Sequence, residues 1–115
     1  MPERSAVPHA TGTPGSPGRA SGPVRVVHGP DDFARVRSGD VLVCRFTEPA
    51  WTVLFGVVAA VVTETGGVLS HAAIVAREHG IPAVLAVPDA MTTLRDGETV
   101  IVDGDAGRVS GHEMG

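Results

Sequence analysis

The stretch of residues 57–82 reads VVAAVVTETGGVLSHAAIVAREHGIP. Its opening run is apolar without alternation as far as Thr63, which is the pattern of a strand covered on both faces and predicts the centre of a sheet. Residues 70–79 are rich in alanine, begin with a serine and are followed by Gly80, so they predict a helix of about three turns. Pro82 then favours an extended exit from that helix.

Strand and helix signals alternate on both sides of this stretch. Short apolar runs predict strands at residues 24–27, 41–44, 83–87, 99–102 and 108–109, with turns at 38–40, 88–91 and 103–105. Short helices are expected at residues 30–36 and 47–55, with Thr47 as N-cap of the second and Pro49 in its first turn. The alternation predicts an α/β domain with a central mixed sheet flanked by short helices.

Length and composition limit the domain organisation. The 115 residues suffice for one domain with a single core. Residues 1–15 are rich in proline, glycine and small polar residues and are expected to form a flexible tail. The domain itself is expected over residues 16–110, followed by a C-terminal tail at 111–115.

Composition also excludes several classes of function. No run approaches the ~18 apolar residues of a membrane span, and the N-terminus resembles neither a signal peptide nor a basic presequence, so we expect a cytoplasmic protein. Cys44 is the only cysteine, which excludes an internal disulfide and a thiolate cluster. A formal charge of -4 argues against nucleic acid and anionic membrane as partners and leaves protein or small molecules.

His71 is the residue whose surroundings most clearly point to a chemical role. It stands at the start of the predicted helix, where the helix dipole favours a bound anion. Gly66 and Gly67 would let a phosphate approach the backbone, and the hydroxyls of Ser70 and Thr63 could orient the ring. A neutral imidazole in this setting could carry a phosphoryl group on a ring nitrogen.

Simpler interpretations stand beside this one. A Gly-Gly turn before Ser-His is by itself weak evidence, because most such histidines cap a helix or fill a gap. Glu64 could act as an acid or base near His71, although a carboxylate at a strand end is usually only solvated. Arg77 lies on a different helical face and could form an ion pair instead. The other histidines show no metal-like pairing, so no metal site is assigned: His9, His28, His79 and His112.

Several motifs together resemble one family. They are Thr63 with Gly66-Gly67, SHAAIVARE at residues 70–78, GIPAV at 80–84, SPGRASG at 16–22, TEPAW at 47–51 and RDGE at 95–98. This set is similar to the phosphohistidine or swivelling domain of phosphoenolpyruvate (PEP)-utilising enzymes, with phosphoenolpyruvate synthase and rifampicin phosphotransferase as the nearest types. The resemblance covers residues 16–110 and implies a single swivelling β/β/α domain.

The resemblance implies roles for individual residues. His71 matches the histidine that shuttles a phosphoryl group between an ATP-grasp module and a second active site. Thr63 matches a threonine near the phosphohistidine, Gly66 and Gly67 match the flexible glycine pair, and Ser70 occupies a position that is Ser, Thr or Cys in relatives. No cofactor is expected on this chain, and ATP and magnesium are expected on a partner.

Two functions from different classes follow from the resemblance. In the first, the chain is a free-standing phosphotransferase component, inactive alone, that takes a phosphoryl group from ATP or phosphoenolpyruvate with an ATP-grasp partner. It then delivers the group to an acceptor bound by another protein, either as a stable product or to activate a hydroxyl for a further step. In the second, the chain is a non-catalytic binding or regulatory module that docks on an ATP-grasp protein.

Overall fold

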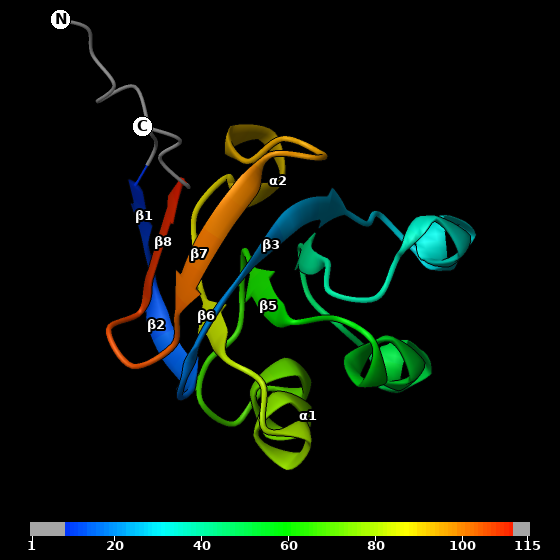
Figure 1. Cartoon of the computed structure of the whole chain (residues 1–115). Helices are drawn as coiled ribbons and strands as arrows, with labels where there is room; N and C mark the ends of the chain where they lie inside the picture. The colour runs from blue at the N-terminus through cyan, green and yellow to red at the C-terminus, as the bar shows by residue number, and fades with distance from the viewer. Residues whose placement is uncertain (1–8, 112–115) are drawn as a thin grey trace, which may run out of the picture.

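The computed structural model describes residues 9–111, which form eight strands and four short helices (Figure 1). The expected tail segments 1–8 and 112–115 lie outside the described residues. The strands are β1 (His9–Thr11), β2 (Thr13–Ser16), β3 (Arg19–Val26), β4 (Val41–Cys44), β5 (Ala60–Thr63), β6 (Ala83–Leu85), β7 (Thr99–Asp103) and β8 (Arg108–Gly111). The helices are α1 (His71–His79), α2 (Ala90–Thr93) and the 3-10 helices η2 (Pro30–Arg35) and η3 (Pro49–Gly56).

The strands form one mixed sheet in the order β1-β8-β7-β3-β4-β5-β6-β2. The neighbours from β3 to β6 are parallel, and the remaining pairs are antiparallel. β3 belongs to both the parallel and the antiparallel part of the sheet (Figure 1). Its residues 19–23 pair antiparallel with β7, and its residues 24–26 pair parallel with β4. The predicted mixed α/β architecture is therefore confirmed.

The parallel strands are buried on both faces, as the unalternating apolar runs predict. Alternate residues belong to two separate apolar clusters. The sheet–sheet cluster joins side chains of the parallel strands with side chains of β7 and β8. It includes Val41, Val43, Ala60, Val62, Val84, Val100 and Val102. The helix-side cluster packs under α1 and η3 and includes Leu42, Cys44, Val61, Ala83, Leu85, Trp51 and Phe55. β5 lies between β4 and β6 and is fully buried, which confirms the predicted strand at residues 60–63, whereas 57–59 precede it.

Helix α1 forms because its capping signals agree with its apolar face. Ser70 is the N-cap, and its side chain accepts a hydrogen bond from the Ala73 N–H. Gly80 ends the helix in the left-handed conformation at φ 69°, which glycine adopts without strain. The alanines and Val75 on one side of α1 are buried in the helix-side cluster. The predicted helix at residues 70–79 is confirmed.

The predicted flexible tail is wrong for residues 9–15. β1 pairs with β8 and β2 pairs with β6, so this one chain segment supplies the strands at both ends of the strand order. The stability of such a segment comes from backbone pairing, which a composition poor in apolar residues does not reveal. Gly12 lies at the joint, donating to the Gly107 carbonyl at 2.8 Å, and an added Cβ there would lie 2.1 Å from the Leu85 carbonyl oxygen.

Two smaller expectations also change. The turn expected at residues 88–91 contains the start of the short helix α2. Thr47 is not the N-cap of η3, because that position is Glu48 and no side chain caps it. Within the described residues, no helix has the length and apolar character needed to cross a membrane.

Candidate functional site

His71 is the first residue of α1, and the loop before it, residues 65–69, is exposed. Its own side chain is half-buried, whereas Val68 and Leu69 are 51% and 81% exposed. The unpaired N–H groups of the first helical turn give this end of α1 a partial positive charge. The structure therefore places a half-buried imidazole at the anion-favouring start of α1, and the predicted position at a helix start is confirmed.

Both ring nitrogens of His71 meet threonine hydroxyls. Nδ1 lies 2.7 Å from Oγ1 of Thr47, and Nε2 lies 3.2 Å from Oγ1 of Thr52. The edge of the Phe55 ring faces the imidazole, with ring centroids 6.1 Å apart and an interplanar angle of 88°. A neutral imidazole has one donor and one acceptor nitrogen, so the two hydroxyls must play opposite parts.

The local structure explains how η3 supplies these contacts. A 3-10 helix has three residues per turn, so Thr52 and Phe55 lie on the same side and both face His71. Trp51 and Leu54 form the neighbouring row and are buried in the helix-side cluster, which anchors η3. Thr47 lies before the helix and is only 7% exposed, whereas Thr52 is exposed. The ring thus has one buried and one accessible partner.

Two hydroxyls that the sequence assigned to the ring make other hydrogen bonds. Thr63 is fully buried at the end of β5, and its hydroxyl donates to the Thr65 carbonyl at 2.7 Å. Ser70 accepts from the Ala73 N–H as the helix cap. These residues shape the loop on either side of Gly66, which adopts φ +108° and would bring an added Cβ within 3.2 Å of Ser70. Gly67 has open space around it.

The charged candidates also point to other partners. Glu64 accepts a hydrogen bond from the Met91 N–H at 2.9 Å, which ties the end of β5 to α2. Arg77 donates to the Gly15 and Val68 carbonyls, each at 2.7 Å, instead of forming the expected ion pair. Arg77 thereby fastens the loop before His71 to β2. Its contacts are those of a structural residue.

Sequence reasoning missed Thr47 and Thr52 as partners of the ring. Within TEPAW the sequence predicts only a capping role for Thr47, and nothing in the spacing of 24 residues to His71 indicates contact. Cys44, on the same side of the sheet, has no chemical role here. Burial, with a smaller contribution from the charge of Glu64, raises the pKa of its thiol to about 12, so it stays protonated. Among residues 9–111, no three metal-ligating side chains gather into a site.

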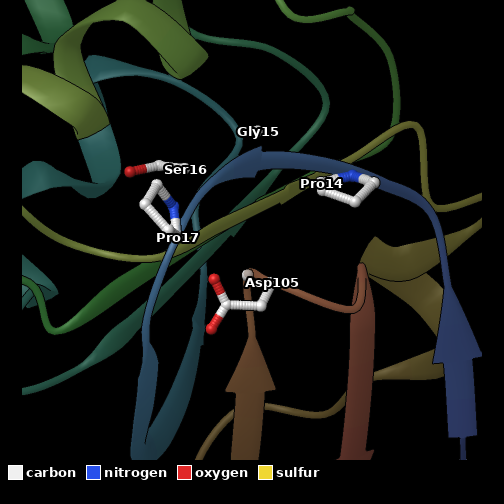
Figure 2. Close-up of a pocket in the computed structure, with 6 residues that line it drawn as sticks. Pro14, Gly15, Ser16, Pro17 and Asp105 are labelled. Atoms are coloured by element: carbon white, nitrogen blue, oxygen red, sulfur yellow. The ribbon is translucent and has the colours of Figure 1, made fainter.

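A pocket of about 200 Å³ lies away from these residues, where β2 turns into β3 beside the β7–β8 turn (Figure 2). Its lining is Pro14, Gly15, Ser16, Pro17, Gly104 and Asp105, and Figure 2 shows the Asp105 carboxylate directed toward Pro17. Gly104 approaches so closely that an added Cβ would lie 1.9 Å from the Ser16 carbonyl oxygen. The pocket includes none of the candidate site residues.

A family model and individual relatives indicate the same protein family for this chain. The family model of the PEP-utilising enzyme, mobile domain, matches residues 36–107, more than half of the chain. Phosphoenolpyruvate synthase from Aeropyrum pernix is 47% identical over 113 residues, 94% of this chain and 14% of that protein. Rifampicin phosphotransferase from Bacillus cereus is 42% identical over 98 residues, 85% of this chain and 11% of that protein. The chain thus spans only a small part of these relatives.

A solved structure agrees with the fold. The solution structure of Enzyme I (nEIt) superimposes with a TM-score of 0.57 at 34% identity, covering 64% of this chain and 31% of that one. The expected resemblance to the synthase and to the rifampicin enzyme is confirmed. The chain therefore belongs to the PEP-utilising enzyme mobile-domain family, the mobile phosphohistidine domain of these phosphotransferases.

Proposed function

We propose that this chain is a phosphohistidine carrier in which His71 receives a phosphoryl group at one protein's donor site and delivers it to an acceptor held by another. The donor site belongs to an ATP-grasp partner that binds ATP and magnesium, and the exchange takes place in the cytoplasm. The chain acts in trans as a free-standing carrier and has no turnover without these proteins. Two relatives support phosphoryl transfer as the chemistry, because their names are phosphoenolpyruvate synthase and rifampicin phosphotransferase.

The observation that carries this proposal is that the two ring nitrogens of His71 have different neighbours, a buried threonine at Nδ1 and an exposed threonine at Nε2. Thr47 is buried and lies 2.7 Å from Nδ1, and we propose that its hydroxyl oxygen accepts a hydrogen bond from Nδ1–H and so fixes the tautomer. Nε2 then keeps its lone pair beside the exposed Thr52. A nucleophile of this kind is neutral and already oriented, as attack on phosphorus requires.

The surroundings favour the charged product. The N-terminal N–H groups of α1 stabilise negative charge close to His71. The exposed loop at Val68 and Leu69 allows the residue to enter a concave partner site. A carrier needs an accessible segment beside its histidine, because the histidine must reach two different active sites.

The test is transfer of label to the purified chain. We would incubate the chain with its candidate ATP-grasp partner and ATP labelled at the β-phosphate, and in parallel with labelled phosphoenolpyruvate. We expect acid-labile, alkali-stable label on the wild type and none on His71→Ala. His28→Ala is the matched control, because the His28 side chain is 76% exposed and its ring pairs with Asp32, so its loss should not affect labelling.

Two results would overturn the carrier role. Label retained on folded His71→Ala would place the phosphoryl group elsewhere. An unlabelled wild-type chain beside a partner that consumes ATP would favour the non-catalytic docking module. Circular dichroism of each variant verifies that it is folded.

A further inference from the structure

We infer that an exposed apolar surface around His71 docks this chain on its phosphoryl donor, and that the donor presents an apolar rim around its bound phosphates. The inference rests on the proposed function and names the chemistry of that partner's docking site. We call the surface the apolar collar. Its members are large apolar side chains that remain exposed: Phe46, Val53, Val68, Leu69 and Ile74.

Three members of the collar belong to α1 and the loop that leads into it. Val68 and Leu69 lie two and three residues or fewer before His71, and Leu69 is 81% exposed. Ile74 lies three residues after His71, so the two side chains share one side of the helix. The imidazole therefore has exposed aliphatic side chains before it and after it along the chain.

The other two members flank this segment from the side. Val53 directly follows Thr52, which lies beside the ring, and η3 runs next to α1 (Figure 1). Phe46 follows Arg45, whose carbonyl accepts a hydrogen bond from the Thr65 N–H at 3.1 Å. The segment that carries Phe46 thus borders the loop before α1, which completes the collar.

The exposed apolar side chains are concentrated at this one place. Within residues 9–111, the further exposed large apolar side chain is Val57, whose carbonyl accepts from the Gly39 N–H at 2.9 Å. Gly39 precedes β4 whereas Arg45 follows it, so Val57 lies toward the opposite end of that strand from Phe46. A contiguous exposed apolar surface of this kind marks a site of protein–protein contact.

The charge pattern selects the donor protein as the occupant. Residues 65–70 carry no charged side chain, and Arg45 and Glu48 on either side of Phe46 have opposite signs. The start of α1, at the centre of the collar, favours an anion. The complementary surface therefore has anionic phosphates at its centre and apolar side chains at its rim, which fits a nucleotide site better than the site of an uncharged hydroxyl acceptor.

An apolar contact also suits the chemistry of the proposed transfer. Closing apolar side chains around the reacting groups expels water, which would otherwise compete with His71 for the phosphoryl group. Exposed apolar side chains contribute little to the free chain and become buried when the donor docks. The collar thus gives affinity and a dry site at the same time.

The experiment measures docking by the kinetics of His71 labelling. We would hold the candidate ATP-grasp partner and ATP labelled at the β-phosphate constant and vary the concentration of the chain. The variants are Leu69→Ser and Ile74→Ser, and Val57→Ser is the matched control, since Val57 is equally apolar, exposed and outside the collar. The series is repeated at about 0.05 M and about 0.5 M NaCl, which screen charges to different extents.

We expect the substitutions to change KM for the chain more than the rate at saturation. Leu69→Ser should raise KM about 10-fold, the value of one leucine side chain that is no longer buried on docking. Ile74→Ser should raise it less, because Ile74 is only 40% exposed and has less surface to bury. Val57→Ser should behave like the wild type, and KM of the wild type should not rise with salt.

The contradicting results separate this inference from the proposed function. If the wild type is labelled and Leu69→Ser has the same KM, the collar is not the docking surface and the carrier role stands. A KM that rises steeply with salt would show a charged docking surface and would overturn the inference in the same way.

Two further results concern other occupants and the carrier itself. Analytical ultracentrifugation of the chain alone that shows a dimer for the wild type and a monomer for Leu69→Ser would assign the collar to a second copy and overturn docking of the donor. A wild-type chain that takes no label would reject the carrier role, and the inference with it.

Discussion

The two faces of the parallel sheet use similar strands for different purposes. The face toward β7 and β8 is lined by aliphatic side chains such as Val43, Val62 and Val84. The opposite face carries Leu42, Val61 and Leu85 under α1 and η3. α1 begins with His71, and η3 carries Thr52 and Phe55, which lie against its ring. The site proposed for phosphoryl transfer thus lies on the face that helices cover.

Physical chemistry explains this division. Between the parallel strands and the β7–β8 pair of the same sheet, side chains from both sides pack together and exclude water, so they are buried. A helix packed on a sheet buries one side and leaves its N-terminus and other side open for a ligand. One face can thus supply stability while the other presents His71 on a fixed support.

The strongest test of this division compares two leucines of equal type. Leu54 lies in the helix-side cluster and Leu94 in the sheet–sheet cluster, and both are nearly buried. Replacing either by alanine should lower the free energy of unfolding by about 2–5 kcal/mol. Urea denaturation measures both effects.

The two leucine variants should then differ in function. Leu54→Ala loosens η3 and should also slow labelling of His71, because η3 supplies Thr52 and Phe55. Leu94→Ala should leave labelling of the folded chain unchanged. Equal effects on labelling would break the distinction between the faces.

The glycine pair gives a smaller effect within the chemical face. Gly66 adopts φ +108° close to Ser70, whereas Gly67 has neither a positive φ nor a neighbour within 4 Å of an added Cβ. Gly66→Ala should therefore cost about 1–3 kcal/mol of stability, and Gly67→Ala much less. Thermal unfolding of the two variants measures the difference, and equal costs would show that the pair acts only as a flexible unit.

The smallest expected effect concerns the buried threonines. Thr47→Val removes the hydroxyl beside Nδ1 and should slow His71 phosphorylation about tenfold, the value of one lost hydrogen bond. Thr63→Val is the control of equal shape, because Thr63 donates to the Thr65 carbonyl and not to the ring. Label transfer at limiting partner concentration measures the rate. A larger loss in Thr63→Val would return the ring-orienting role to Thr63.

Much of this architecture follows from the sequence. The unalternating run up to Thr63 predicts a strand buried on both faces, and Ser70 with Gly80 delimits α1. These signals depend only on neighbouring residues, so they predict structure without knowledge of the fold. His71 at a helix start is predicted for the same reason.

The remaining features depend on contacts between distant segments. Pairing of residues 9–16 with β6 and β8 is a backbone effect that composition does not encode. The contacts of Thr47 and Thr52 with His71 join residues 24 and 19 positions apart and require η3 to pack on α1. Arg77 likewise finds its partner Gly15 only after β2 has joined the sheet.

The first measurement we would make locates the phosphoryl group on the phosphorylated chain by a ¹H–³¹P correlation spectrum under alkaline conditions. We predict coupling of phosphorus to both ring protons of His71, Hε1 and Hδ2, because the threonine beside Nδ1 is buried whereas the one beside Nε2 is exposed. Coupling to Hε1 alone would place phosphorus on Nδ1. Coupling to another residue would remove His71 from the reaction, and either result would overturn the proposed carrier chemistry.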